Sequence, residues 1–236
     1  MKPKQFHFKQ TSIYHHNSTM KVGTDAILLA VWCDVNNASN ILDVGTGSGV
    51  IALLLATRSL AKVHAVELHE DSAAEAALNF KNYPANKILI FEDDFNNFAV
   101  NQKQKYDLIV SNPPFFTNSL LPDNKSRNAA RHTNTLSHNQ LCKGVTSLLS
   151  ENGKFSLVLP HEIAINFTKI ASKFNLHLHR QLVIHPKPNT LPNRINMEFR
   201  FKNNPTIITE KITIRNTNGE YSIQYKSFVK DYLIKI

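Results

Sequence analysis

Two short motifs carry residue types that could grip a small organic molecule. The first is DVGTGSG at residues 43–49, where one carboxylate precedes three glycines. The second is SNPPFF at 111–116, where an amide, two prolines and two aromatic rings follow the strand-like run YDLIV. Each proline fixes its own φ and pushes the residue before it toward extended geometry, so this segment is stiff. A stiff loop that holds one carboxamide beside exposed rings suits a flat, polar ligand.

The glycine motif falls at an expected strand-to-helix junction, where backbone N–H groups are free and glycines let a ligand approach the chain. A dinucleotide would place its pyrophosphate at the helix N-terminus, where the Asp43 carboxylate would repel it. S-adenosylmethionine has no phosphate and carries an ammonium that Asp43 could meet directly or through water. Asp43 with Gly45, Gly47 and Gly49 therefore predicts an S-adenosylmethionine site, with an ordinary tight turn as the alternative.

Acidic residues follow the next two expected strands. Glu67 ends the second strand, where a carboxylate can accept both hydroxyls of a ribose, with a solvated surface glutamate as the alternative. Asp94 and Phe95 lie just beyond the third strand and could meet the adenine amino group and the edge of its ring. Glu92 and Asp93 are adjacent and could supply the carboxylate instead.

Asn112 and Pro113 offer two acceptors for one amino group. The lone pair of a purine amino group is delocalised into the ring, so the nitrogen is a poor nucleophile. The Asn112 side-chain oxygen and the Pro113 carbonyl can take its two hydrogens and aim the lone pair at a sulfonium methyl group, without a strong general base. Phe115 would stack on the base, a contact worth roughly 1 to 3 kcal/mol, and Phe116 would assist.

Length and composition point to a folded, non-membrane protein. The 236 residues fit one α/β domain, and the longest apolar run, VIALLLA at 50–56, is too short to cross a bilayer. The N-terminus lacks the apolar core of a signal peptide, so a cytoplasmic location is expected. Cys33 and Cys142 lie far apart, which supports neither a disulfide framework nor a zinc site. Residues 151–236 carry thirteen Lys or Arg against six Asp or Glu, which suits either a polyanion partner or a generally basic surface.

Short apolar runs alternate with helix-like segments, which predicts a mainly parallel sheet covered by helices. The expected strands are residues 40–44, 62–66, 87–91, 106–111, 154–160, 176–184 and 194–202, the last two as an antiparallel pair. The expected helices are residues 48–59, 70–81, 135–149 and 161–173, and a hairpin and helix should follow after 203. The loop at 117–134 is long and polar, so it is a candidate substrate loop.

The two motifs together resemble the Rossmann-like class I methyltransferases that act on exocyclic amino groups. With residues 8–32, ARHTNTL at 130–136 and the tail at 221–234, the chain is similar to the bacterial tRNA1(Val) (adenine(37)-N6)-methyltransferase family over almost its whole length. The resemblance implies a seven-stranded, mostly parallel sheet with one antiparallel strand and helices on both faces. It also implies S-adenosylmethionine-dependent N6-methylation of adenosine 37 in a tRNA anticodon loop. Lys21, Gly23, Thr24 and Asp25 would close the cofactor pocket.

One methyltransferase domain over 1–236 is expected, with an N-terminal segment (1–39), a core (40–202) and a C-terminal hairpin and helix (203–236). Arg131 and His132 are candidate substrate contacts. Four basic residues are candidate contacts for tRNA phosphates: Lys187, Arg194, Arg200 and Lys202. His177 and His179 lack a third ligand, so no metal site is expected. A monomer is expected, and no membrane partner.

The contacts expected from Asn112 and Pro113 would also suit methyl-accepting substrates other than adenine. A guanine-N2 methyltransferase acting on ribosomal RNA would use the same contacts. A glutamine-N5 protein methyltransferase would also use an amide contact, but the basic ends of the chain would then have no role in binding the substrate. A non-catalytic RNA-binding module would bind the cofactor poorly.

Overall fold

The computed structural model describes residues 5–18, 20–83, 88–114 and 136–235. Its centre is an eight-stranded sheet in the order β10-β8-β9-β7-β6-β3-β4-β5. In chain order the strands are β3 (Asn40–Val44), β4 (Lys62–Glu67), β5 (Ile88–Glu92), β6 (Tyr106–Ser111), β7 (Leu149–Pro160), β8 (His177–His185), β9 (Arg194–Arg200) and β10 (Ile208–Thr213). β9 runs antiparallel to β7 and β8, and the other neighbours are parallel. The predicted fold class is confirmed, with one strand more than expected.

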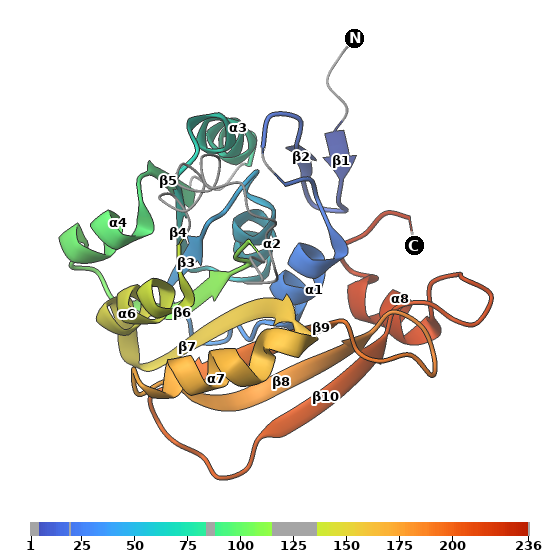
Figure 1. Ribbon diagram of the computed structural model, residues 1–236. Helices are drawn as coiled ribbons and strands as arrows, with labels where there is room; N and C mark the ends of the chain where they lie inside the picture. The colour runs from blue at the N-terminus through green and yellow to red at the C-terminus, as the bar shows by residue number, and fades with distance from the viewer. Residues whose placement is uncertain (1–4, 19, 84–87, 115–135, 236) are drawn as a thin grey trace, which may run out of the picture.

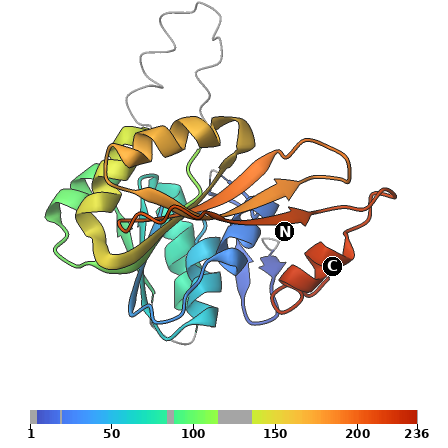
Figure 2. The ribbon, with the colours of Figure 1, turned by 90° about the horizontal axis from the view of Figure 1, so that it is seen from below.

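Helices cover both faces of the sheet, which Figure 2 shows edge-on. One face carries α1 (Thr24–Trp32), α2 (Val50–Arg58), α3 (Glu70–Lys81) and α8 (Ile223–Val229). The other face carries α4 (Phe95–Asn101), α6 (His138–Leu148) and α7 (Ala164–Ser172), which follows the short 3-10 helix η1 (His161–Ile163). Each helical layer packs its own apolar core against the sheet. Two layers of cover explain why β3 reads NILDV, with residues 41–44 all buried.

Side chains join the last strand, β10, to α1. β10 pairs in parallel with β8, in register from Ile208↔Arg180 to Thr213↔His185. Trp32 Nε1 at the end of α1 donates to Glu210 Oε2 at 2.8 Å, and the Arg180 guanidinium lies 4.2 Å from the centre of the Trp32 ring. After β10 the described residues show the antiparallel bridge Arg215↔Tyr221 and then α8.

The N-terminal segment returns to the C-terminal one. Strands β1 (Gln5–His7) and β2 (Ser12–Tyr14) form a separate antiparallel hairpin. Phe8 bridges Leu233, and the backbone N–H of Lys9 donates to the carbonyl of Tyr232 at 2.8 Å. Figure 1 shows this hairpin close to the C-terminal segment, on the same side of the molecule as α1. Within the described part of the chain, no helix combines the length and the apolar character needed to span a bilayer.

Candidate active site

A cavity of about 530 Å³ opens at the carboxyl ends of β3, β4 and β6. This is the edge where open parallel sheets bind ligands, and the volume lies in the usual range for small-molecule sites. Predicted site residues that line it are Lys21, Gly23, Thr24, Asp25, Gly45, Gly47, Glu67, Asp94, Phe95, Asn112 and Pro113. The structure therefore brings together residues from five separate stretches of the chain.

The glycine loop between β3 and α2 forms the floor of the cavity. Gly45 and Gly47 have φ of 70° and 57°, a backbone conformation that favours glycine. A Cβ built at either position would meet no heavy atom of the described residues within 4 Å. Open space above two glycines of the lining lets a ligand lie directly against the backbone. Gly49 does not line the cavity; its Cβ would lie 2.4 Å from Cε1 of Phe80, so it serves the packing of α2 on α3.

Asp43 lies beneath the loop and does not line the cavity. Its side chain is fully buried, and Oδ2 accepts from the Thr46 hydroxyl at 2.6 Å and from the Ala52 N–H at 3.1 Å. Its other oxygen, Oδ1, has no hydrogen-bond partner among the residues that the structure describes. Burial raises the pKa of Asp43 to about 7, although the bonds from Thr46 and Ala52 oppose the shift. The carboxylate thus shapes the glycine loop from below.

Glu67 is held in place at the end of β4. The Gly47 N–H donates to Oε2 at 2.8 Å and the His69 N–H donates to Oε1 at 3.0 Å. The residue is only 6% exposed, yet it lines the cavity. Two backbone donors fix the carboxylate at the position where nucleotide folds of this topology bind a ribose.

Of the three consecutive acids at the end of β5, Asp93 and Asp94 line the cavity, whereas Glu92, the last residue of the strand, is exposed outside the lining. Asp94 is the N-cap of α4, where Oδ1 accepts from the N–H groups of Asn96 at 2.8 Å and Asn97 at 3.4 Å. Capping engages Oδ1 of Asp94, so the two aspartates remain alternatives for meeting an adenine amino group.

Asn112 follows β6 beside the glycine loop. Ser111 pairs with Val44 in the sheet, and its hydroxyl donates to the Val44 carbonyl at 2.9 Å. The next residue, Asn112, lines the cavity, and its Oδ1 is buried without a partner in the described residues. A buried amide oxygen at a cavity wall is costly unless a ligand supplies a donor. Phe115, Phe116, Arg131 and His132, with the loop around them, lie outside the described residues.

The N-terminal wall of the cavity is held by two buried polar residues of α3 that the sequence analysis missed. Glu75 accepts from the backbone N–H groups of residues 16, 17 and 18 at 2.6, 3.1 and 2.9 Å. Asn79 donates to the carbonyls of Tyr14 and Ser48, both at 2.8 Å, and its Oδ1 accepts from the Tyr14 N–H at 2.8 Å. We call Glu75 and Asn79 the α3 clasp. It joins the segment that leads to Met20 and Lys21 to the glycine loop.

The pKa of Glu75 reports the same contacts. Burial alone would raise it, but the N–H groups of Asn17, Ser18 and His16 hold the pKa below its usual range. The ionised form of the carboxylate is therefore favoured while these three N–H groups are bonded to it. The sequence gives one weak signal for the α3 clasp: Glu75 and Asn79 are four residues apart and lie on the same helix face as the apolar Ala76 and Phe80. Polar residues on a buried helix face indicate that they have hydrogen-bond partners, but not which ones.

Two further contacts join this wall to the C-terminal part of the chain. Arg194 stands at the start of β9, and its Nε lies 2.8 Å from Oδ2 of Asp25, which lines the cavity. The side chain of Thr24, also in the lining, lies beside the Tyr225 phenol of α8 and acts to lower its pKa. Burial raises the pKa of Tyr225 to about 12, so it stays a neutral phenol.

Comparison with known proteins decides the family. Residues 9–178 match the model of the "Methyltransferase small domain" family. The tRNA1(Val) (adenine(37)-N6)-methyltransferase of Bacteroides fragilis is 40% identical over 233 residues, 98% of either chain. The enzyme of that name from Yersinia pestis is 36% identical over 232 residues, 97% of this chain and 93% of the relative. The chain belongs to the tRNA1(Val) (adenine(37)-N6)-methyltransferase family.

Solved structures share the fold. A predicted O-methyltransferase from Agrobacterium tumefaciens matches with a TM-score of 0.65 at 16% identity, covering 90% of this chain and 100% of that one. The T. thermophilus 16S rRNA N2 G1207 methyltransferase, in complex with AdoMet and guanosine, matches with a TM-score of 0.60 at 17% identity, covering 84% of this chain and 50% of that one. Members of this family are S-adenosylmethionine-dependent methyltransferases, and the chain is such an enzyme.

The described residues fit the cofactor. The glycine floor admits a ligand against the backbone, and two backbone N–H groups hold the Glu67 carboxylate at the cavity wall, where it can accept from a ligand hydroxyl. Among the described residues, no cluster of three or more His, Cys, Asp or Glu side chains could hold a metal ion.

Proposed function

We propose that the chain methylates N6 of adenosine 37 in the anticodon loop of tRNA1(Val). Relatives that carry this name match 98% of the chain at 40% identity. The observation that carries the chemistry is the Asn112 amide, whose Oδ1 is buried and unpartnered among the described residues at the cavity wall. An adenine amino group is the donor that this acceptor lacks.

The residues of the site act by orientation. When bound, S-adenosylmethionine supplies an electrophilic methyl group. Asn112 Oδ1 and the Pro113 carbonyl accept the two amino hydrogens, which pyramidalises the nitrogen and directs its lone pair. Two fixed acceptors replace a general base, since preorganised dipoles and alignment contribute most of the rate. The two prolines keep the acceptors in place, because neither can adopt other φ values.

The remaining site and partner assignments are part of the proposal. Phe115, assisted by Phe116, stacks on a base that has been drawn out of the anticodon loop, and Arg131 and His132 contact the nucleotide. Either Asp93 or Asp94 receives the cofactor adenine. Residues 1–236 act as one methyltransferase domain, a monomer in the cytoplasm, with the N-terminal segment closing the cofactor pocket.

Nucleoside mass spectrometry tests the reaction. The enzyme is incubated with S-adenosylmethionine and unmodified tRNA1(Val), and N6-methyladenosine is expected. Parallel incubations contain ribosomal RNA or protein. N2-methylguanosine in the RNA, or N5-methylglutamine found by peptide mass spectrometry, with no product in tRNA would replace the proposal by one of the alternative substrates. Failure to bind the cofactor in a calorimetric titration would leave a non-catalytic RNA-binding module.

The Asn112→Ala variant tests the mechanism. Loss of one preorganised polar group costs about 100- to 1000-fold in kcat. Cofactor affinity should change little, because the acceptor serves the substrate amino group. Equal loss of cofactor affinity and of turnover would assign Asn112 a structural role.

A further inference from the structure

Two loops lie side by side at the carboxyl edge of the sheet, next to the cavity. One is residues 186–193, between β8 and β9, and the other is residues 214–221, after β10. The Ile214 N–H donates to the His185 carbonyl at 2.9 Å, and the Arg215 N–H donates to the Pro186 carbonyl at 3.1 Å. Both loops project on the α8 side of the molecule in two perpendicular views (Figures 1 and 2). We call residues 186–194 and 214–221 the edge ridge.

The edge ridge is fastened to the wall of the cavity at two points. Arg194, at its inner end, is paired with Asp25. Tyr221, in the second loop, stacks on Tyr225 with ring centres 4.7 Å apart and an interplanar angle of 21°, and the Tyr225 phenol lies beside Thr24. Asp25 and Thr24 both line the cavity. A polymer held on the edge ridge therefore lies beside the cavity mouth.

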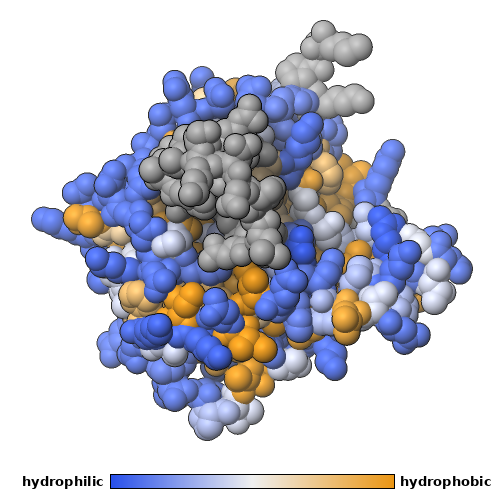
Figure 3. Space-filling model, viewed as in Figure 1, coloured by the Kyte–Doolittle hydropathy of each residue, from blue (hydrophilic) through white to orange (hydrophobic). Residues whose placement is uncertain are grey.

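The edge ridge presents two exposed cations, Lys187 and Arg215. The Arg215 guanidinium lies 4.6 Å from the centre of the Tyr221 ring, and its Nη1 donates to the Gly219 carbonyl at 2.6 Å. Stacking and this bond fix the guanidinium before any partner arrives, which lowers the entropy lost on binding. The one carboxylate within the two loops, Glu220, is bonded by the Asn216 side chain at 3.3 Å. Figure 3 shows a mostly hydrophilic surface on this side.

The basic residues at the other end of β9 face a different way. Arg200 is bound to the buried Glu198 carboxylate through Nε at 2.9 Å and Nη2 at 2.7 Å. Lys202 lines a polar recess of about 490 Å³ with Arg200 and His179. Arg194 and Arg200 are six residue-to-residue steps apart along an extended strand, a span of about 20 Å. Arg200 and Lys202 therefore lie at the amino edge, away from the cavity mouth.

We propose that the edge ridge holds the sugar-phosphate backbone of the tRNA beside the methylated base, with Lys187 and Arg215 as phosphate contacts. This inference rests on the proposed function, because it assigns the docking surface of the same reaction. It divides the four basic residues expected from the sequence: Lys187 and Arg194 lie on the edge ridge, whereas Arg200 and Lys202 do not. Arg194 supports the edge ridge through Asp25, and Arg215 is added to the surface.

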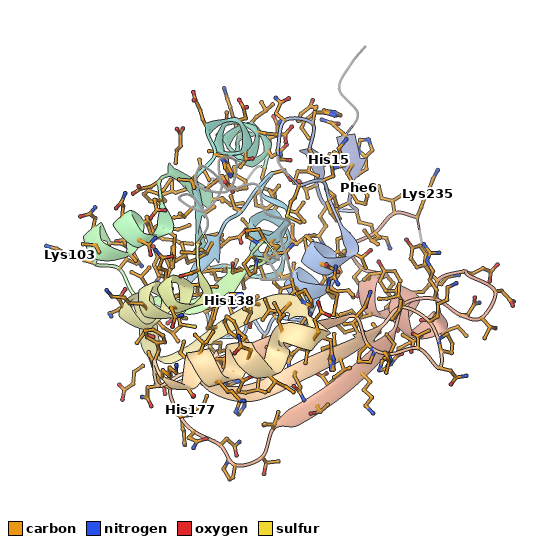
Figure 4. The ribbon with its side chains drawn as sticks, in the orientation of Figure 1. Phe6, His15, Lys103, His138, His177 and Lys235 are labelled. Atoms are coloured by element: carbon orange, nitrogen blue, oxygen red, sulfur yellow. The ribbon has the colours of Figure 1, made fainter. Side chains whose placement is uncertain are left out.

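The experiment compares two double variants of the full chain. K187A/R215A removes both exposed cations of the edge ridge. K103A/K202A removes two exposed cations elsewhere; Lys103 follows α4 and lies on the far side of the molecule from α8 in Figure 4. Affinity for tRNA1(Val) is measured by fluorescence anisotropy between about 50 and 200 mM salt, the range in which phosphate contacts are most visible. Cofactor affinity is measured by calorimetry on the same samples.

For K187A/R215A we expect the slope of log affinity against log salt to fall in magnitude by about 1 to 2, and tRNA affinity to fall by about tenfold. K103A/K202A should retain the slope of the wild type. K187E leaves the Arg215 stack intact and should lower the slope by about 1, which keeps the test valid if the double variant is unstable. All variants should retain cofactor affinity.

Three results would overturn the inference: equal slopes for wild type and K187A/R215A, a loss in K103A/K202A as large as in the edge ridge variant, or no tRNA binding by the wild type. Failure of the proposed function is separate. A wild type that binds tRNA with the edge ridge salt dependence but forms no N6-methyladenosine would refute the reaction and retain the docking surface.

Discussion

Glu75→Gln should weaken cofactor binding without removing any residue that lines the cavity. Glu75 accepts three backbone N–H groups from residues 16–18, and these residues lead directly to the N-terminal wall at Met20 and Lys21. Gln has the same shape but only one acceptor oxygen. Its NH₂ group must then face at least one N–H donor, so the closed segment loses at least one bond.

The size of the effect follows from the charge of the lost acceptor. A hydrogen bond to a charged group contributes about 1.5 to 3 kcal/mol. The backbone N–H that then faces the glutamine NH₂ group gains no replacement hydrogen bond. If the cofactor binds only when the segment is closed, this free energy is lost from binding. We expect the Kd for S-adenosylmethionine to rise by about 10- to 150-fold.

Two measurements test this prediction. Calorimetric titration gives the Kd, and hydrogen exchange of the amides of residues 16–18 reports whether the segment opens. Glu70→Gln is the matched control, since Glu70 is exposed in the first turn of the same helix. Cofactor affinity in the wild type should also decline as the pH falls through the depressed pKa of Glu75, because protonation removes the charged acceptor. Unchanged Kd with unchanged amide protection in Glu75→Gln would refute the role of the α3 clasp.

Two further predictions concern stability. Asp43 has a folded-state pKa raised to about 7 from 3.8, so its contribution to stability is present below about pH 4 and is lost as the pH rises through 7. Chemical denaturation should show that Asp43→Asn lacks this decline and is more stable than the wild type at pH 8 by about 1 to 3 kcal/mol; a parallel pH dependence in the two proteins would contradict the shift. Gly49→Ala should destabilise by about 2 to 4 kcal/mol, because its Cβ meets Phe80 at 2.4 Å and its φ is 87°. Gly219→Ala, with φ of 85° and open space, should lose only about 1 kcal/mol, and equal losses in urea titrations would show that the Phe80 contact contributes nothing.

The parallel core of the fold could be predicted from the sequence because its strands are buried on both faces. Runs such as NILDV and YDLIVS read as continuous apolar segments, and the structure places strands at both. β10 was missed as a member of the main sheet. Its sequence, ITEKIT, is exposed at four of six positions, and an edge strand has no need for an apolar run.

The chemistry of the site was predictable where it follows the ends of strands. Glu67 and Asn112 occupy such ends, and the topology alone brings them to one cavity. The α3 clasp was not predictable, since Glu75 bonds to backbone groups 57 to 59 residues away, and a backbone partner leaves no trace in residue type. The distinction between Asp43 behind the floor and Gly45 within it also depends on side-chain direction, which spacing does not give.

The contacts between the N-terminal and C-terminal segments limit the order in which the protein can fold during its synthesis. The strands from β3 to β6 can pair as soon as they leave the ribosome, and the glycine loop forms with them. The contacts of Thr24 with Tyr225 and of Phe8 with Leu233 can form only after Tyr225 and Leu233 have been synthesised. The N-terminal wall lacks these supports until then. A nascent chain of this enzyme therefore carries an unfinished cofactor pocket until Tyr225 and Leu233 have been added.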